Sequence, residues 1–140
     1  MHTSDNCTFC RIVSEPRQAD DIFENENILV ILDIDWAVKG HTLVVWKKHV
    51  INASDLSEQE FSHFSKVLHR TEAALLKLLH KDRSVILKTG GLVPHFHFHI
   101  YPVSSHTSWK EIKDMFDKKV RYKPKESEKE EFLEELKRKL

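Results

Sequence analysis

Three histidines at every second position are the residues best suited to chemistry in this 140-residue chain: His95, His97 and His99. Residues two apart in a β-strand share a face and lie roughly 7 Å apart, so the three imidazoles would line one face. Exposed histidines on an edge strand, a catalytic metal site and nucleophilic catalysis by an imidazole all fit the pattern. Because imidazoles are costly to bury without partners, the strict spacing beside Gly90 and Gly91 favours a functional role.

Two cysteines form a second candidate group. Cys7 and Cys10 are separated by two residues, which fits a redox pair, half of a metal site or a chance pairing. Residues 1–6 are polar and lack the apolar stretch of a signal peptide. We therefore expect a cytoplasmic protein with reduced thiols, in which a metal or redox role is favoured over a structural disulfide.

Short apolar runs bounded by turn residues predict the strands that carry these side chains. One run, 28–33, ends at Asp33, a carboxylate that needs a partner beside so apolar a strand. An earlier strand is expected to end in a turn at 23–27. The other predicted strands cover residues 41–46, 84–88 and 94–101.

A long amphipathic helix is predicted over residues 57–80. Ser57 and Glu60 form a capping box at its start. Behind them, apolar residues recur at intervals of three and four, as one buried helix face requires. These residues are Phe61, Phe64, Val67, Leu68, Leu75, Leu78 and Leu79. The segment at 7–15 is expected to form a short helix or turn.

Residues 104–140 are predicted to be a helical extension packed on a domain formed by residues 1–103. Capping boxes at Ser108 and Ser127 begin two helices. Inward positions are expected at Trp109, Ile112, Met115 and Phe116 in the first helix, and at Phe132, Leu133, Leu136 and Leu140 in the second. The charged residues between 118 and 139 are most simply a basic linker and a solvated helix face.

Composition narrows the class of protein. Lys plus Arg total 22 and Asp plus Glu total 22, a balance that argues against nucleic-acid binding. No apolar segment approaches the ~20 residues of a membrane-spanning helix. One long helix among strands joined by short loops predicts an α+β fold, with an antiparallel sheet covered by the helix on one face.

The histidine pattern belongs to a longer resemblance. Residues 93–99 (VPHFHFH) resemble the signature of the histidine triad (HIT) family of nucleotide hydrolases and transferases. Residues 9–12 (FCRI), 32–34 (LDI) and 39–49 (KGHTLVVWKKH) are similar to its other blocks, in the same order. The resemblance covers roughly residues 7–103 and implies a HIT-like fold with a sheet of about five strands.

The resemblance also implies catalytic roles. His97 matches the nucleophile that attacks the α-phosphate and carries a covalent nucleotidyl intermediate, and His99 matches a neighbour that hydrogen-bonds a phosphate oxygen. His41 matches the fourth histidine of the site, and His95 completes the triad. A neutral imidazole is a competent nucleophile near pH 7, so this chemistry needs no catalytic metal.

Two ligand sites follow from the same resemblance. Asp33 matches the carboxylate that binds the ribose hydroxyls, and the apolar slot for the base would be formed by Phe9, Ile12, Ile31, Leu32 and Ile34. For Ile31 and Leu32, ordinary core packing is an equal alternative. Some members of the family bind one structural Zn²⁺ with a set that corresponds here to Cys7, Cys10, His49 and His95.

Three positions depart from the family's pattern. Gly91, Leu92 and Val103 stand where Gln or Asn, Ser and Arg are common. The contacts of those side chains to phosphate and leaving group must therefore come from elsewhere. Backbone amides at Gly90 and Gly91 are candidates, as are the side chains of Lys88 and Thr89.

The sequence thus predicts a homodimeric enzyme that cleaves an α-phosphate bond of a nucleotide conjugate such as an adenylated molecule or a dinucleoside polyphosphate. The departures favour one alternative, a nucleotide-binding regulatory module with little activity. A hydrolase that uses the triad as metal ligands is a further alternative.

Overall fold

Five strands form one antiparallel sheet in the order β1-β2-β3-β5-β4 in the computed structural model, which describes residues 6–18 and 20–140. The polar segment considered above as lacking a signal peptide lies mostly outside the described residues. The strands are β1 (Asp21–Glu24), β2 (Ile28–Leu32), β3 (Thr42–Trp46), β4 (Arg83–Leu87) and β5 (His97–Val103). The helices are α1 (Thr8–Ser14), α2 (Glu58–Leu79), α3 (Trp109–Phe116) and α4 (Glu126–Lys139), with a short 3-10 helix at Ala53–Asp55. The α+β prediction is confirmed.

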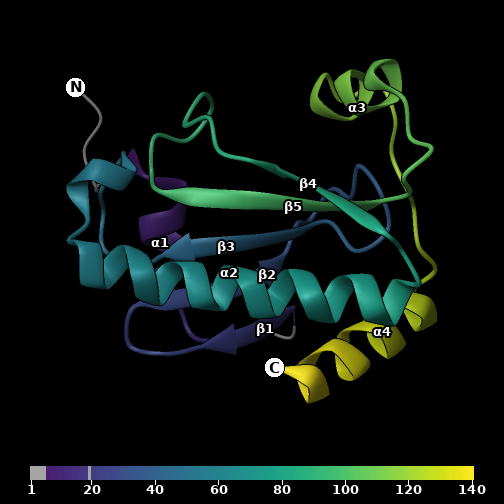
Figure 1. Ribbon diagram of the computed structural model, residues 1–140. Helices are drawn as coiled ribbons and strands as arrows, with labels where there is room; N and C mark the ends of the chain where they lie inside the picture. Colours follow the sequence, from purple (N-terminus) through teal and green to yellow (C-terminus); the bar gives the residue numbers. More distant parts are fainter. Residues whose placement is uncertain (1–5, 19) are drawn as a thin grey trace.

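The two faces of the sheet are covered by different helices (Figure 1). Side chains such as Val30 and Val44 face α2 and belong to the main core. Ile31 and Leu43 face the other way and pack with Phe9 of α1. Because β2 and β3 are apolar on both faces, all ten of their residues are buried.

The long helix α2 begins as the capping box predicts. The Glu60 N–H donates to Ser57 Oγ at 3.0 Å, and the Ser57 N–H donates to Glu60 Oε1 at 2.8 Å. Phe64, fully buried, packs its ring against those of Phe96 and Phe98, with centroids 4.8 and 5.2 Å away. The helix α2 therefore packs against the apolar side of the triad segment, and the histidines of that segment face away from the main core.

The triad segment enters the sheet later than predicted. β5 begins at His97, not at residue 94, because Pro94 has no N–H and the Phe96 N–H donates to Val50 O at 2.7 Å outside the ladder. His95 thus precedes the strand. The alternation of faces still holds, since Phe96 is in the main core and His97 pairs with Val45 on the other face.

The extension contains both predicted helices, with two differences. Trp109 is 66% exposed rather than inward, while Ile112 and Met115 are buried. α4 begins at Glu126, ahead of the predicted cap at Ser127, and the Lys125 N–H donates to Glu128 Oε1. Three apolar residues of α4 join the main core: Phe132, Leu133 and Leu136. Among the described residues, no helix is long and apolar enough to cross a membrane.

Candidate active site and metal centre

A cavity of about 480 Å³ opens in front of the triad strand. We call it the histidine pocket, after His41, His97 and His99 in its wall. Its other lining residues come from α1, the β2–β3 loop, β3, β4, the 89–93 loop, β5, α3 and the segment that follows α3. They are Phe9, Asp33, Asp35, Ala37, Leu43, Leu87, Thr89, Gly91, Leu92, Val93, Tyr101, Met115, Phe116, Lys118 and Arg121.

His97 is held in one tautomer by the backbone. Its Nδ1 lies 2.5 Å from the carbonyl oxygen of His95, which can only accept, so Nδ1 carries the proton. Nε2 therefore has the lone pair and is the ring's nucleophilic atom. Burial lowers the pKa of His97, which keeps the imidazole neutral near pH 7. The ring of Phe9 lies 4.4 Å away, centroid to centroid, and fixes the imidazole from the side.

His41 and His99 form a neutral pair beside His97. The Ala37 N–H donates to His41 Nδ1 at 3.4 Å, which leaves the proton on His41 Nε2. That N–H donates to His99 Nδ1 at 2.9 Å, so His99 carries its own proton on Nε2. Burial is the main reason why the pKa of each falls to about 4. The pair thus offers a hydrogen-bond donor at His99 Nε2 without a positive charge.

Asp33 places a carboxylate at the edge of this pair. Its Oδ2 lies 3.6 Å from His41 Nε2 and 4.0 Å from His99 Nδ1, while its Oδ1 accepts from the Asp35 N–H at 2.9 Å. The three groups together could hold a cation. However, the 2.9 Å between His41 and His99 is a hydrogen-bond distance, shorter than the roughly 3.3 Å between two nitrogen ligands of tetrahedral zinc.

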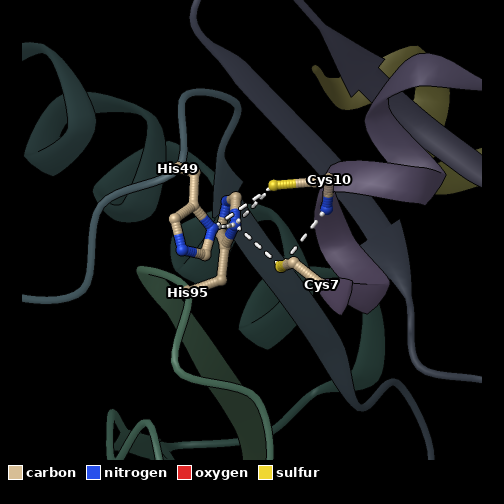
Figure 2. Close-up of side chains that lie close together, drawn as sticks. All are labelled: Cys7, Cys10, His49 and His95. Carbon is tan, nitrogen blue, oxygen red and sulfur yellow. Dashed lines mark hydrogen bonds between the residues drawn. The ribbon is translucent and has the colours of Figure 1, made fainter. Parts of the chain in front are cut away.

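A second group, which we call the Cys/His cluster, contains Cys7, Cys10, His49 and His95 (Figure 2). Cys7 lies 3.3 Å from His95 Nδ1, Cys10 lies 3.3 Å from His49 Nδ1, and the two Nδ1 atoms are 3.2 Å apart. Tetrahedral zinc would separate two nitrogens by roughly 3.3 Å and a nitrogen and a sulfur by roughly 3.6 Å. The cluster therefore has the donor set and the spacing of a closed zinc site.

The surroundings of the cluster also suit a metal. His95 Nε2 lies 2.6 Å from the Trp46 carbonyl oxygen, which puts the proton on Nε2 and the lone pair on Nδ1, facing the thiols. Burial, with contributions from Cys7, raises the pKa of Cys10 to about 11. Two thiols so close together become thiolates readily only when a cation neutralises them.

The predicted site residues fall into three groups. Asp33, Phe9 and Gly91 line the histidine pocket with its three histidines. Ile12 and Ile31 do not line the pocket and belong to the same apolar cluster as Phe9. The remaining predicted contacts lie off the pocket wall: Leu32 in the main core on the α2 side, Ile34 at 92% exposure, Gly90 in the adjacent loop and His95 in the Cys/His cluster.

Several residues that line the pocket were not named in the sequence analysis, among them Tyr101, Lys118 and Arg121. Tyr101 follows His99 by two positions on β5, and its ring lies 4.2 Å from that of His41. Burial, with the charge of Asp33, raises its pKa to about 12, so its hydroxyl stays a donor. The same period of two could have identified it. Lys118 and Arg121 come from the extension, and no local pattern places them at the pocket.

Comparison with known proteins identifies this arrangement. A sequence profile described as the HIT domain matches residues 15–106. The chain belongs to the HIT family. Among curated members, it is 36% identical over 100 residues to the uncharacterized HIT-like protein MJ0866 of Methanocaldococcus jannaschii, covering 69% of this chain and 78% of that protein. The match confirms the resemblance stated from the sequence.

Two further HIT proteins are informative. A zinc-bound histidine triad family protein from Mycobacterium smegmatis has a crystal structure that aligns with a TM-score of 0.73 and 29% identity, covering 97% of this chain and 96% of that one. A bifunctional adenosine 5'-phosphosulfate phosphorylase/adenylylsulfatase, HINT4 of Arabidopsis thaliana, is 29% identical over 114 residues, which are 76% of this chain and 77% of that protein. The zinc-binding variant of the family is thus represented among its structural neighbours.

Proposed function

We propose that this HIT protein cleaves the α-phosphate bond of a nucleotide conjugate through a covalent nucleotidyl intermediate on His97. The observation that carries the proposal is the hydrogen bond from His97 Nδ1 to the His95 carbonyl, because it leaves Nε2 as the nucleophile of a ring that lines the pocket. The adenylylsulfatase activity in the name of HINT4 supports this reaction class.

The reaction would proceed in two displacements. His97 Nε2 forms a bond to the α-phosphorus, while the bond from phosphorus to the leaving group breaks and that group departs with the electron pair. The His99 Nε2–H and the Tyr101 hydroxyl are donors suited to the charge on the phosphoryl oxygens. Water then attacks phosphorus, loses a proton and displaces His97, so that the nucleoside monophosphate leaves and the neutral imidazole returns.

The nucleoside would occupy the apolar side of the histidine pocket. Phe9, which shares an apolar cluster with Ile12 and Ile31, offers a surface for the base, and the Asp33 carboxylate can accept hydrogen bonds from ribose hydroxyls. Because Ile34 points into solvent and Leu32 into the core, we leave both out of the proposed contacts.

We propose one structural Zn²⁺ per chain in the Cys/His cluster. Cys7, Cys10, His49 and His95 would hold it, and the metal would tie α1 to the segment before β5. The zinc-bound relative from Mycobacterium smegmatis supports this assignment. The residues of the histidine pocket perform every step above, with His97 outside the set of ligands.

A homodimer is also proposed. β4 is an outer strand of the sheet, and Ile86 on it is 40% exposed, so this edge has apolar surface available to a second copy. Light scattering after size exclusion should give twice the 16.5 kDa of one chain. A mass of one chain would contradict the dimer.

The alternative is a nucleotide-binding regulatory module with little activity, favoured by Gly91, Leu92 and Val103 in place of the usual polar side chains. Calorimetric titration with AMP beside a turnover assay separates the two functions. Tight binding without AMP release from any conjugate would favour the module.

Trapping the intermediate tests the proposed enzyme directly. The protein is mixed with diadenosine triphosphate or adenosine 5'-phosphoramidate, quenched in alkali and examined by mass spectrometry. We expect a mass increase equal to one AMP group, located on His97 by peptide mapping. AMP release without any adduct, or an adduct on another residue that persists in His97→Gly, would overturn the mechanism.

A further inference from the structure

Lys118 has an unusual backbone conformation at the edge of the histidine pocket. It follows α3 with φ of 61°, in the left-handed region. The Lys118 N–H donates to Met115 O at 3.3 Å, and the Lys119 N–H donates to Asp114 O at 2.9 Å. This is the Schellman pattern of helix termination, in which glycine is the usual residue at the left-handed position. A lysine there accepts a backbone strain that glycine would avoid.

The strained position places a positive charge in the pocket wall. Lys118 and Arg121 both line the cavity that contains His97 and His99. Burial and the neighbouring histidines are the main causes of the lowered pKa of His99, and the Lys118 charge lowers it further. The Lys118 ammonium is therefore close enough to the triad to act on a ligand bound there.

The two cations differ in what neutralises them. Arg121 Nε donates to Asp35 Oδ2 at 2.8 Å, and the Tyr122 N–H donates to Trp36 O at 2.8 Å. These contacts fix the segment after α3 against the β2–β3 loop and compensate the charge of Arg121. Among the described residues, Lys118 is in no ion pair, and it is exposed. Its charge remains available to a ligand.

We propose that Lys118 is a specificity-determining residue that binds the anionic leaving group attached to the α-phosphate. The inference rests on the proposed function and deepens it, because it selects conjugates with a second phosphate or a comparable oxyanion over conjugates with an uncharged leaving group. Lys118 lies outside residues 15–106, the segment matched by the HIT domain. It would supply the positive charge that the family commonly has after the triad, where this chain has Val103.

Two substrates with leaving groups of different charge test the proposal. Diadenosine triphosphate releases the anion ADP, whereas adenosine 5'-phosphoramidate releases ammonia. In Lys118→Gly, kcat/KM for the first should fall about five- to tenfold, while that for the second stays within about twofold of wild type. Lys118→Arg should retain the wild-type ratio of kcat/KM between the two substrates. Because glycine suits the left-handed backbone, Lys118→Gly should be at least as stable as wild type, and Lys119→Gln is the matched control.

Equal losses on both substrates, or no loss on either, would overturn the role of Lys118. If the wild-type protein releases AMP from neither substrate, the proposed function fails instead. Calorimetry with ADP and AMP then still tests Lys118. Wild type should bind ADP about fivefold more tightly than AMP, and Lys118→Gly should remove that difference. An unchanged ratio would contradict the proposal.

Discussion

His95 and His97 are two residues apart and are both tied to a backbone carbonyl, yet they serve different sites. His95 uses Nε2 to reach Trp46 O, which leaves Nδ1 facing the thiols of the Cys/His cluster. His97 uses Nδ1 to reach His95 O, which leaves the lone pair of Nε2 available in the histidine pocket, as the proposed nucleophile requires. The role of each imidazole thus depends on which nitrogen the backbone occupies.

The two sites also differ in access and in connection. The Cys/His cluster brings four potential ligand atoms to mutual distances that fit one small cation, whereas the histidine pocket is open to a ligand of nucleotide size. They are connected through His95, whose ring belongs to the first and whose carbonyl orients the second. Loss of the proposed zinc should therefore disturb His97 indirectly, and loss of the His97 imidazole should leave the proposed zinc in place.

The largest expected effect is on turnover. His97→Ala should lower AMP release by about 10³- to 10⁴-fold, because the proposed covalent intermediate forms on the imidazole that this variant removes. Its zinc content by elemental analysis and its thermal midpoint should match those of wild type. His69→Ala, on the outer side of α2, is the control. Residual turnover within tenfold of wild type would mean that His97 is not the nucleophile.

In contrast to His97→Ala, a substitution in the Cys/His cluster should change zinc content and stability directly. Cys7→Ser should lose zinc and lower the free energy of unfolding by about 3 kcal/mol, because α1 loses its tie to the triad segment. Urea denaturation and elemental analysis measure the two effects, with Ser14→Ala on the same helix as control. If Cys7→Ser keeps one zinc per chain, or if His97→Ala loses it, the two sites are not separate as described.

Acid should lower the free energy of unfolding through protonation of His41 and His99. Each has a pKa near 6.5 in the unfolded chain and about 4 in the folded one, so the unfolded state binds more protons between these values. The contribution of the neutral pair to the free energy of unfolding is therefore complete above pH 6.5. It is lost as the pH falls from 6.5 to 4, and the loss for the coupled pair is about 2–4 kcal/mol. Urea denaturation with a chelator present removes the metal's contribution. His99→Asn should flatten the profile, and an unchanged slope would contradict the neutral pair.

A smaller effect is expected at the ribose side. Asp33→Asn should weaken AMP binding about fivefold, because a neutral amide is a poorer acceptor for ribose hydroxyls than a carboxylate. Asp35→Asn is the matched control, since its carboxylate is occupied by Arg121. Calorimetry measures both affinities. Equal weakening in the two variants would indicate a general charge effect rather than a contact from Asp33.

The features that sequence reasoning predicted depend on local rules. The capping box at Ser57 places the start of α2, and alternation places Phe96 and His97 on opposite faces. The spacing of Cys7 and Cys10 left a redox pair, half of a metal site and a chance pairing open, and only the family resemblance favoured the metal site and added His49 and His95. Local pattern was sufficient wherever neighbours in sequence are also neighbours in space.

The differences arise where distant contacts decide. The bond from the Phe96 N–H to Val50 delays the start of β5. α4 starts early because Glu128 is held by Lys39 at 2.9 Å and by the Tyr122 hydroxyl. The placement of Lys118 at the pocket likewise depends on how α3 ends and where the following segment is fixed. The contacts of Val50 and Lys39 join segments that are far apart in the sequence, so no local pattern predicts them.

The burial of α4 in the main core affects how the chain can fold during synthesis. Phe132 and Leu136 contact the same core as Leu75 and Trp36, which are made much earlier. A nascent chain stopped near residue 120 would expose that apolar surface until the ribosome had released the segment beyond it. Folding on the ribosome should therefore be late and abrupt, and premature termination should yield a chaperone substrate rather than a smaller enzyme.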